Sequence, residues 1–255
     1  MSASSTSVID VQSKHVTVRS FLDSPIEPAM LQSILQGARR SPTSSNMQAY
    51  SILVIRDPET KKELAKLAGN QKHIESCPVF LVFCADLNRL GHACEMHGVQ
   101  MQNNLETFLI STIDAALVGM STQTAAESHG LGGVMIGALR NHPQKVAELL
   151  GLPKGVYGVF GMCLGWPDPE KIPAQKPRLP ETLVIHEEKY SNQDPVELLS
   201  QHDNELRKHY EDLGHNLDIA AWSGVISRNL SRPARPQNID IFEGMGFHIC
   251  HKPHE

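Results

Sequence analysis

The feature that most constrains the fold is one uninterrupted helical pattern between Gln102 and Gly130. Apolar and small residues recur there at spacings of three and four, which is the period of one face of an α-helix. These residues are Leu105, Phe108, Leu109, Thr112, Ala116, Leu117 and Met120. The later turns are rich in Ala, Ser and Thr, and the pattern stops at "HGLGG". The sequence therefore predicts a fold organised around one long, closely packed helix.

Short apolar runs on both sides of this helix predict strands. "YSILVIRDP" is closed by Asp-Pro, and "CPVFLVFCAD" is apolar almost throughout. "VYGVFGMCLGWP" is a further predicted strand, interrupted by glycines, and "VMIGALRN" is another apolar run. "SPIEPAMLQSILQGARR" and "ETKKELAKLAG" have helical patterns. Because helices and strands alternate irregularly, we expect an α+β or mixed α/β fold.

The chain divides by composition into three parts. Residues 1–13 lack the basic and apolar regions of a secretory signal, and we predict a short flexible tail. Residues 14–190 carry the apolar runs and are expected to form the core domain. From about Ser191 the chain becomes polar, so residues 191–255 predict a helical excursion that ends in a tail rich in Pro and His.

Charge and cysteine usage narrow the classes of function. The formal net charge is −5 at pH 7 and no basic stripe is present, which argues against nucleic acid as a partner. No apolar run approaches the roughly 20 residues that cross a bilayer, so we expect no membrane partner. The five cysteines are scattered, and Cys84 and Cys163 fall inside predicted strands, where a reduced thiol acts as a small apolar side chain. This usage is typical of a cytoplasmic protein.

Nucleotide and hydrolase motifs are missing from the sequence. There is no G-x-x-x-x-G-K-[ST], "GLGGVMIG" does not match G-x-G-x-x-G, and there is no G-x-S-x-G. A stronger signal is "SPTSSNMQAY" (residues 41–50), between a predicted helix and a predicted strand. Its many hydroxyl and amide groups and its lack of charge indicate either a surface turn or a site for a neutral polar ligand or one end of an anion.

Three groups of basic residues are candidates for a phosphate site. They are His15, Thr17 and Arg19 in "HVTVR", Lys72 in "GNQKH", and Lys176 and Arg178 in "KPR". Alternate residues share one face of an extended chain, so each alternating group points one way. Each group alone is typical of a solvated face, and together they predict a monophosphate site.

Two clusters of histidine and cysteine support a rival hypothesis, a zinc or copper site. They are His92, Cys94 and His97 in "HACEMH", and His248, Cys250, His251 and His254 in "HICHKPH". Neither is a recognised closed set of four ligands, and the second lies at the end of the chain. We therefore assign no metal site.

Taken in order, these segments resemble the nitroreductase family, in particular its oxygen-insensitive NADPH nitroreductases and NADPH–FMN flavin reductases. The resemblance is carried by "HVTVRSFLDSPI", "ARRSPTSSNMQAYSI", "LAGNQKHIE", "FLVFCADLNR", "DAALVGMSTQTAAESHGLGGVMIGALRN", "FGMCLGWP" and "KPRLP". It is dense over residues 14–180 and weaker to about residue 223. It implies an α+β fold, with a mostly antiparallel sheet flanked by helices, and an intertwined homodimer with FMN at the interface.

The resemblance also implies which residues bind FMN. The ribityl phosphate would lie among His15, Val16, Thr17, Arg19, Lys176 and Arg178, with Thr43, Ser44 and Ser45 reaching it from the other subunit. Gln71 and Lys72 would lie at the pyrimidine side of the flavin. Met135, Ile136, Gly137 and Ala138 would run along the ring, with the backbone N–H of Gly137 or Ala138 directed at flavin N5.

The implied activity is a ping-pong reaction in which NADH or NADPH passes hydride to flavin N5 and an electron-poor acceptor then takes the electrons. Nitroaromatics, quinones and free flavin are the acceptors that we expect. No catalytic side chain is assigned, because FMN carries the chemistry. Two alternatives stay open: a flavin reductase that releases reduced FMN to a partner enzyme, and a flavin- or metal-binding protein without turnover.

Several positions depart from the family pattern. Val16 stands where an arginine is usual, Met135 where a tyrosine is common, Ala138 where a glycine is common, and Asn46 where a large aromatic residue is frequent. Relatives selective for NADPH carry arginines just before Trp222, where this chain has Asp218 and Ile219. An acidic residue suits a ribose hydroxyl better than a 2′-phosphate. We therefore predict use of NADH or of both donors, although Arg228, Arg232 and Arg235 downstream could compensate.

Overall fold

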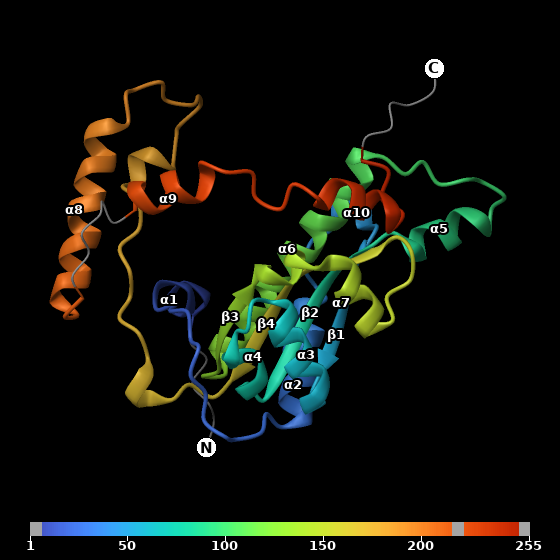
Figure 1. Ribbon diagram of the computed structural model, residues 1–255, viewed down its shortest axis with the longest axis horizontal. Coiled ribbons are helices and arrows are strands. Elements are labelled where there is room, and N and C mark those ends of the chain that lie inside the picture. Colours follow the sequence, from blue (N-terminus) through green and yellow to red (C-terminus); the bar gives the residue numbers. More distant parts are fainter. Residues whose placement is uncertain (1–6, 216–221, 250–255) are drawn as a thin grey trace. The chain divides into compact units, whose positions relative to one another are not determined.

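The computed structural model describes residues 7–215 and 222–249 (Figure 1). The chain forms two compact units, one of residues 1–173 with 237–255, and one of residues 174–236. We call them the core unit and the excursion unit and describe each by itself. The composition boundaries after residues 13 and 190 remain predictions.

The core unit is built on a four-stranded antiparallel sheet with the order β1-β2-β4-β3. The strands are β1 (Tyr50–Ile55), β2 (Val79–Asp86), β3 (Gly132–Ile136) and β4 (Val156–Gly165). The α+β class and the antiparallel sheet are thus confirmed. Strands β1 and β3 form the two edges of this sheet.

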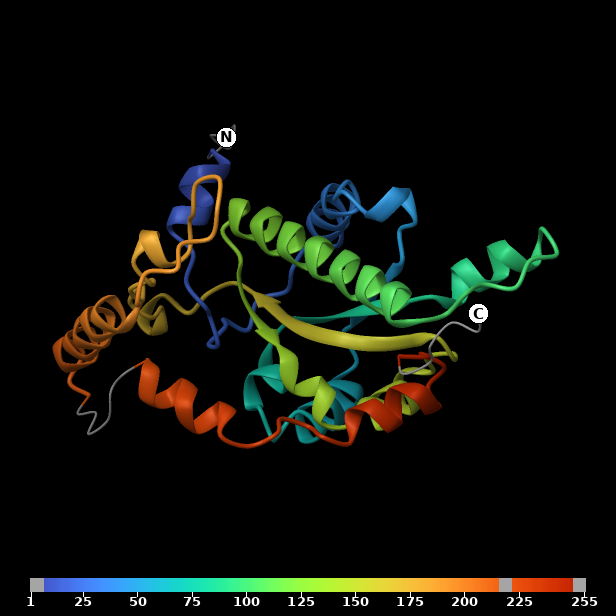
Figure 2. The same ribbon diagram turned by 90° about the horizontal axis from the view of Figure 1, so that it is seen from above.

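Strand β2 is covered by helices on both faces. Leu81 and Phe83 pack in one core with helices α2 and α6, whereas Phe80 and Val82 pack in a second core with α3, α4 and α7. Figure 2 shows α6 lying along one face of the sheet. A strand buried on both faces needs apolar residues at every position, which explains the continuous run in the sequence.

The helices of the core unit are α1 (Val8–Ser13), α2 (Pro28–Ala38), α3 (Pro58–Leu67), α4 (Lys72–Ser76), α5 (Asn88–Glu95), α6 (Leu105–Ser128), α7 (Pro143–Leu150) and α10 (Asn238–Gly244). Short 3₁₀ turns are η1 (Ser44–Asn46), η2 (Gly137–Asn141) and η3 (Pro169–Lys171). The long helix expected between residues 102 and 130 is α6, which confirms that prediction. Residues 8–13, expected as part of a flexible tail, form a helix that contacts α6.

Helix α6 is fixed at both ends and packs closely in between. The side chain of Asn104 accepts hydrogen bonds from the backbone N–H groups of Glu106 and Thr107. The Thr107 hydroxyl accepts one from the Asn104 N–H, and together these bonds form a capping box. The helix ends before Gly130, whose φ of 82° suits glycine. At Gly119 a Cβ atom would lie 2.4 Å from Cζ of Phe160 on β4, so only glycine permits this approach.

One face of α6 remains apolar and exposed. Leu109, Ile113, Leu117 and Met120 follow each other at helical spacing on that face. By length and composition α6 is the one helix in residues 7–215 and 222–249 that could cross a membrane. Its other face contacts all four strands and α2 and carries the buried polar residues Asp114 and Gln123, so we interpret it as a core helix.

The excursion unit contains η4 (Glu181–Leu183), α8 (Val196–Asp212) and α9 (Ser223–Leu230). Within the described part of this unit, only His202, Asp203 and Leu206 are buried. The Asp203 carboxylate accepts hydrogen bonds from the backbone N–H groups of Trp222, at 2.8 Å, and Ser223, at 2.9 Å, and from the Ser223 hydroxyl at 2.5 Å. Asp203 therefore ties the start of α9 to α8.

Candidate cofactor site

The segment that contains "HVTVR" lies beside edge strand β3. The Val18 N–H donates to the Gly133 carbonyl at 3.0 Å. A Cβ atom on Gly132 would lie 2.7 Å from Cγ2 of Val18, so the strand has glycine where the segment passes. This contact places the predicted phosphate-binding residues of the segment along one edge of the sheet.

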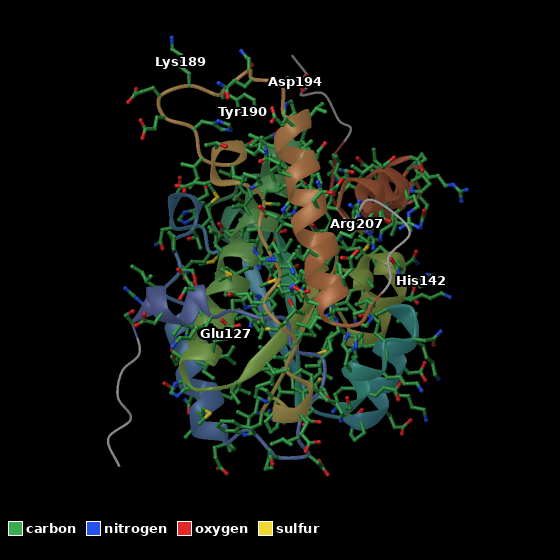
Figure 3. The ribbon with its side chains drawn as sticks, turned by 90° about the vertical axis from the view of Figure 1, so that its left-hand side faces the viewer. Glu127, His142, Lys189, Tyr190, Asp194 and Arg207 are labelled. Atoms are coloured by element: carbon green, nitrogen blue, oxygen red, sulfur yellow. The ribbon has the colours of Figure 1, made fainter. Side chains whose placement is uncertain are left out.

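Two side chains of this segment have defined neighbours on other elements. His15 Nδ1 lies 2.5 Å from Oε1 of Glu127, near the C-terminal end of α6. Figure 3 shows Glu127 on that helix, beside the N-terminal helix α1. Burial lowers the pKa of His73 on α4, and the positive charge of Arg19 lowers it further. Arg19 is therefore close enough to α4 to act on it electrostatically.

Gln71 and Lys72 stand at the start of α4. Gln71 is half-buried and its amide donates to the Ala68 carbonyl at 2.9 Å, whereas Lys72 is exposed. The preceding residue, Asn70, has a φ of 60°. Gln71 and Lys72 directly precede His73, the residue whose pKa is lowered by burial and by the charge of Arg19.

The residues predicted to run along the flavin differ in what they offer. Met135 points outward from β3 and is 42% exposed, whereas the Ile136 side chain is 2% exposed and packs in the core. Ile136 can therefore contribute only its backbone. A Cβ atom on Gly137 would lie 3.3 Å from the Arg140 guanidinium, and Arg140 itself donates to the Val159 carbonyl. Ala138 follows, half-buried.

Val16 makes a different contact from its two neighbours. It lines a small cavity of about 270 Å³ that is also lined by Lys14, Val18 and Glu127. Val16 and Thr17, the next residue, are both half-buried.

The hydroxyl-rich loop has an unusual backbone. Ser45, Asn46 and Gln48 have φ values of 47°, 58° and 52°, the left-handed region that is unfavourable for residues with a side chain. Such conformations cost on the order of 1–3 kcal/mol each and persist only where the surroundings hold them. Here buried Asp114 of α6 accepts hydrogen bonds from the N–H of Ser44, at 3.1 Å, and of Ala49, at 3.0 Å. The loop is therefore a shaped element, which favours a binding role over a surface turn.

This loop and the "HVTVR" segment belong to opposite edges of the sheet. The loop leads into β1, and its Thr43 hydroxyl accepts a hydrogen bond from the Gln48 N–H at 3.3 Å. The segment lies along β3. A single chain does not bring the two groups of predicted ligands together through these contacts.

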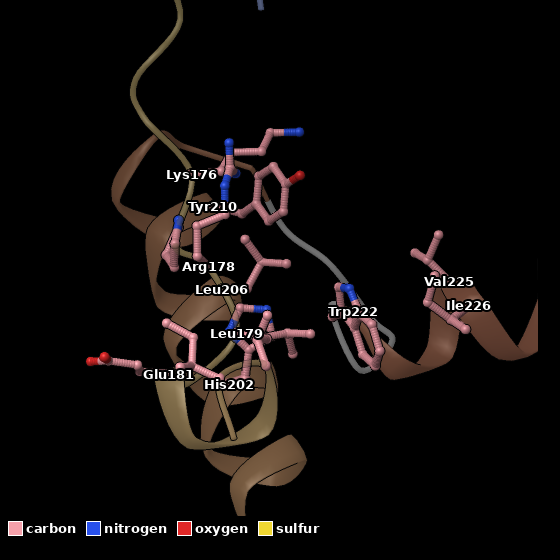
Figure 4. Close-up of a pocket in the computed structure, with 13 residues that line it drawn as sticks. Lys176, Arg178, Leu179, Glu181, His202, Leu206, Tyr210, Trp222, Val225 and Ile226 are labelled. Carbon is pink, nitrogen blue, oxygen red and sulfur yellow. The ribbon is translucent and has the colours of Figure 1, made fainter. Parts of the chain in front are cut away.

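Lys176 and Arg178 lie in the excursion unit, where both line a cavity of about 710 Å³. In Figure 4 they stand with Tyr210 at one end, with Trp222 towards the other. Lys176 Nζ is 5.4 Å from the centre of the Tyr210 ring, a cation–π distance. The remaining lining is mainly apolar, so this cavity combines two cations with an apolar wall.

The two clusters of the rival metal hypothesis are only partly described by the structure. Across residues 7–215 and 222–249 no three His, Cys, Asp or Glu side chains are grouped to hold a metal ion, and His92 is paired with Glu95 at 3.0 Å. Cys250, His251 and His254 lie outside the described residues, as do Asp218 and Ile219, on which the prediction of donor preference rests.

Sequence reasoning missed three polar residues of α6 that organise the site: Asp114, Gln123 and Glu127. Asp114 accepts a hydrogen bond from the hydroxyl-rich loop. Gln123 donates a hydrogen bond to Glu127, which in turn contacts His15. Asp114 and Gln123 are buried, on the face of α6 that packs against the sheet. Buried polar groups need partners, so an acid or amide among apolar core positions is the signal that could have identified them.

Comparison with known proteins decides the family. The chain matches the model of the nitroreductase family over residues 13–166 and the model of the nitroreductase family C-terminal domain over residues 176–250. This protein belongs to the nitroreductase family. It is 39% identical to the oxygen-insensitive NADPH nitroreductase of Salmonella typhimurium, over 94% of this chain and 97% of that protein. It is 36% identical to the FMN reductase [NAD(P)H] of Bacillus subtilis, over 95% and 98%.

Solved structures of this family share the fold over almost the full length. NfrA2 of B. megaterium superposes with a TM-score of 0.91 at 34% identity, covering 96% of this chain and 99% of that chain. NADPH:FMN oxidoreductase from Vibrio harveyi, solved in complex with NAD⁺, gives a TM-score of 0.84 at 36% identity, covering 94% and 97%. The nitroreductase fold expected from the sequence is thereby confirmed.

Proposed function

We propose that this nitroreductase is an FMN-dependent NAD(P)H oxidoreductase that reduces small, flat, electron-poor acceptors such as nitroaromatics, quinones or free flavin. Family membership and the names of full-length relatives, which include an FMN reductase and an NADPH nitroreductase, support the cofactor and the electron donor. The observation that carries the proposal is the edge of β3. There a segment with His15 and Arg19 passes along a glycine-containing strand that leaves Met135 exposed.

The residues along this edge fit FMN by their chemistry. His15, Thr17 and Arg19 offer the cationic and hydroxyl donors that a phosphate monoester accepts. The exposed Met135 side chain offers an apolar, polarisable surface for a flat ring. Gln71 and Lys72 offer an amide and an ammonium group for the polar edge of a flavin. The assignment of Lys176 and Arg178 to the phosphate rests on the sequence and the family resemblance alone and stays a prediction.

FMN, when bound, supplies a ring that takes up and returns hydride at N5. The protein residues bind and orient. Gly137 leaves room for the Arg140 guanidinium beside the backbone, and the amide N–H of Gly137 or Ala138 would donate a hydrogen bond to the ring. The positive charge of Lys72 would stabilise negative charge that develops on the polar edge of the ring. No side chain is proposed as a catalytic acid or base.

The active form is proposed to be a homodimer. The exposed apolar face of α6, formed by Leu109, Ile113, Leu117 and Met120, is of the kind that a second subunit covers. A twofold arrangement would also let Thr43, Ser44 and Ser45 of one subunit approach the β3 edge of the other, which they do not reach within one chain. A charge in this face, as in Ile113→Lys, should therefore lower both the dimer fraction, measured by light scattering, and FMN binding.

Release of reduced flavin is the second candidate function. Full-length relatives named FMN reductase favour it. The two modes differ in how tightly FMN is held, because a reductase that supplies free flavin must exchange it during turnover. Retention of all FMN through exhaustive dialysis and turnover would exclude this candidate.

The donor preference is proposed from the sequence alone. Asp218 stands where an acidic residue disfavours the 2′-phosphate of NADPH, so NADH or both donors should be used. The substitution Asp218→Arg should raise the ratio of kcat/KM for NADPH to that for NADH. An unchanged ratio would remove this proposal and leave Arg228, Arg232 and Arg235 as candidates.

A cytoplasmic location is proposed as well, since Cys77, Cys84, Cys94 and Cys163 are free thiols.

The activity itself is tested by steady-state kinetics on protein reconstituted with FMN. Oxidation of NADH or NADPH should require both FMN and an acceptor, and reciprocal plots at several acceptor concentrations should be parallel, as in a ping-pong reaction. Turnover that is independent of FMN would contradict the proposal.

A further inference from the structure

A chain of hydrogen bonds connects α6 to the "HVTVR" segment, which is predicted to bind phosphate. The proposed transfer of hydride through FMN does not require it. The Gln123 amide donates to Oε1 of Glu127 at 2.6 Å, and the same oxygen lies 2.5 Å from Nδ1 of His15. The contact joins residues 112 positions apart in the sequence. The contact therefore depends on the tertiary structure and does not follow from the local conformation of α6.

The chain of hydrogen bonds runs from a buried amide to a partly exposed histidine. Gln123 is 2% exposed, and the side chains of Glu127 and His15 are 12% and 30% exposed. A Cβ atom on Gly133 would lie 2.8 Å from the Gln123 side-chain oxygen, so β3 has glycine where this amide passes. Gln123 is thus confined between α6 and β3, and it restricts where Glu127 can lie.

Glu127 acts on His15 in two ways. A carboxylate only accepts hydrogen bonds, so the contact requires a proton on Nδ1 of His15, which sets the tautomer and the ring plane. The opposite ring edge, with Nε2, is then turned away from Glu127. A phosphate oxygen also only accepts, so a ring that donates to both groups carries an extra proton, whose charge the carboxylate balances.

A carboxylate next to a phosphate-binding segment repels the phosphate and so weakens its binding. Its presence there is explained if it also strengthens binding through another residue of the segment. We propose that Glu127, held by Gln123, is a positioning residue for the phosphate group of FMN and acts only through the orientation and charge of His15. This proposal rests on the proposed function. Outer residues that orient a metal-binding histidine play the same part, and their loss weakens binding by about 10–100-fold.

The test compares two flavins that differ only in the phosphate. Binding of FMN and of riboflavin to the flavin-free protein is measured by quenching of flavin fluorescence. Glu127→Ala should raise the Kd for FMN by about 10-fold, and the Kd for riboflavin should change far less. Glu127→Gln keeps an acceptor oxygen but loses the charge, so its effect should lie between those of wild type and Glu127→Ala. Glu106→Gln, which removes an exposed carboxylate of the same helix, is the matched control and should change neither Kd.

A double-mutant cycle separates this role from a general effect on folding. In a His15→Ala background, adding Glu127→Ala should not weaken FMN binding further, because the route through His15 is already lost. Nitrogen NMR of His15 gives a readout without cofactor: the proton on Nδ1 should be seen in wild type and lost from its fixed position in Glu127→Ala. Thermal melting of each variant controls for folding.

Three results would overturn the proposal. They are equal weakening of FMN and riboflavin binding, additive effects in the cycle, and an unchanged or tighter Kd for FMN in Glu127→Ala. Wild-type protein that binds neither flavin would overturn the proposed function as well. Wild type that binds FMN, with variants that bind it equally, would overturn the positioning role alone.

Discussion

The core unit and the excursion unit are stabilised in different ways. In the core unit β2 and β4 are buried along their whole length, and glycines at positions 119 and 161 admit the rings of Phe160 and Phe80 into close contact. In the described part of the excursion unit, α8 contributes one buried apolar residue, Leu206, beside His202 and Asp203. One unit depends on apolar packing, whereas the other depends on a few hydrogen bonds.

This difference indicates where the protein can tolerate change. The strained loop at Ser45 and the contact between His15 and Glu127 are both fixed to α6 of the core unit. Their geometry should therefore persist as long as the core unit stays folded. The excursion unit has little apolar burial of its own to resist local opening. Its cavity, with Lys176 and Arg178, is therefore expected to adjust more easily to different ligands.

The same substitution in both units gives the largest expected effects. Leu81→Ala empties a fully buried site between β-sheet and helices, and Leu206→Ala empties one that is 7% exposed. Leucine-to-alanine changes in cores cost about 2–5 kcal/mol, and we expect Leu81→Ala near the upper end and Leu206→Ala near the lower end. Urea unfolding gives the two free energies. A larger loss of stability in Leu206→Ala than in Leu81→Ala would show that the excursion unit also depends on apolar packing.

Asp114→Ala tests the anchoring of the hydroxyl-rich loop. It leaves the N–H groups of Ser44 and Ala49 without their acceptor. Ala49 is buried, and an unsatisfied buried N–H costs about 1–3 kcal/mol, whereas Ser44 is exposed and its N–H can bond to water. We expect lower stability in urea and faster amide exchange confined to the loop and α6. Asp114→Asn keeps one acceptor oxygen and should lose less. Equal exchange in both variants and wild type would show that the loop holds its strained backbone without Asp114.

Acid should affect the excursion unit through Asp203. Burial raises the pKa of this carboxyl, but hydrogen bonds from Ser223 and Trp222 outweigh it, so the pKa is lowered in the folded protein. A lowered carboxyl pKa contributes stability above the unfolded value, about 3.9, that is lost as the pH falls through the folded value. With Trp166→Phe, Trp222 is the only tryptophan, and its fluorescence reports this unit alone.

In the Trp166→Phe protein, we expect Trp222 fluorescence to change below about pH 4. When Asp203→Asn is added, this change should disappear, because the asparagine side chain cannot titrate. The Asn variant should already resemble the acid form at neutral pH. A fluorescence change of the same size and midpoint in both proteins would assign it to other carboxyls.

The helix cap of α6 gives the smallest expected effect. Asn104→Ala removes the acceptor for the N–H groups of Glu106 and Thr107. Loss of such a cap costs about 1 kcal/mol. Calorimetry should show a modest fall in Tm with unchanged FMN affinity, since the cap is at the far end of α6 from Glu127. A fall in affinity would mean that the whole helix, rather than its C-terminal part, sets the site.

Hydrophobic patterns were sufficient to predict the scaffold. The run at Val79–Asp86 and the helical spacing over α6 reflect burial directly, so strands and helix could be located from residue type alone. The hydroxyl-rich loop was recognised by composition, but its left-handed residues were not, because Ser45 and Gln48 carry no preference for that region. An acid among the apolar positions of α6 marks Asp114 as a residue that needs partners, but the partners themselves could not be predicted, since they are 65 and 70 residues away in the sequence.

The resemblance, rather than any periodicity, identified which polar residues form the candidate site. It did not include Glu127 or Gln123, whose importance depends on contacts between α6, β3 and the N-terminal segment. A buried amide among apolar positions could have marked Gln123, but no local pattern shows which distant residues it and Glu127 contact. The short helix at residues 8–13, within the predicted tail of residues 1–13, was not foreseen for a related reason, because so short a helix depends on packing against α6.

The anaerobic visible spectrum of the purified protein after addition of FMN tests most directly whether this protein is a flavoenzyme that takes hydride from NAD(P)H. We predict yellow protein with one FMN per chain, bleached by one equivalent of NADH, with NADPH acting equally or less well. Bleaching by NADPH alone would keep the enzyme and remove the meaning given to Asp218. Protein that stays colourless after added FMN, or yellow protein that neither donor bleaches, would contradict the account.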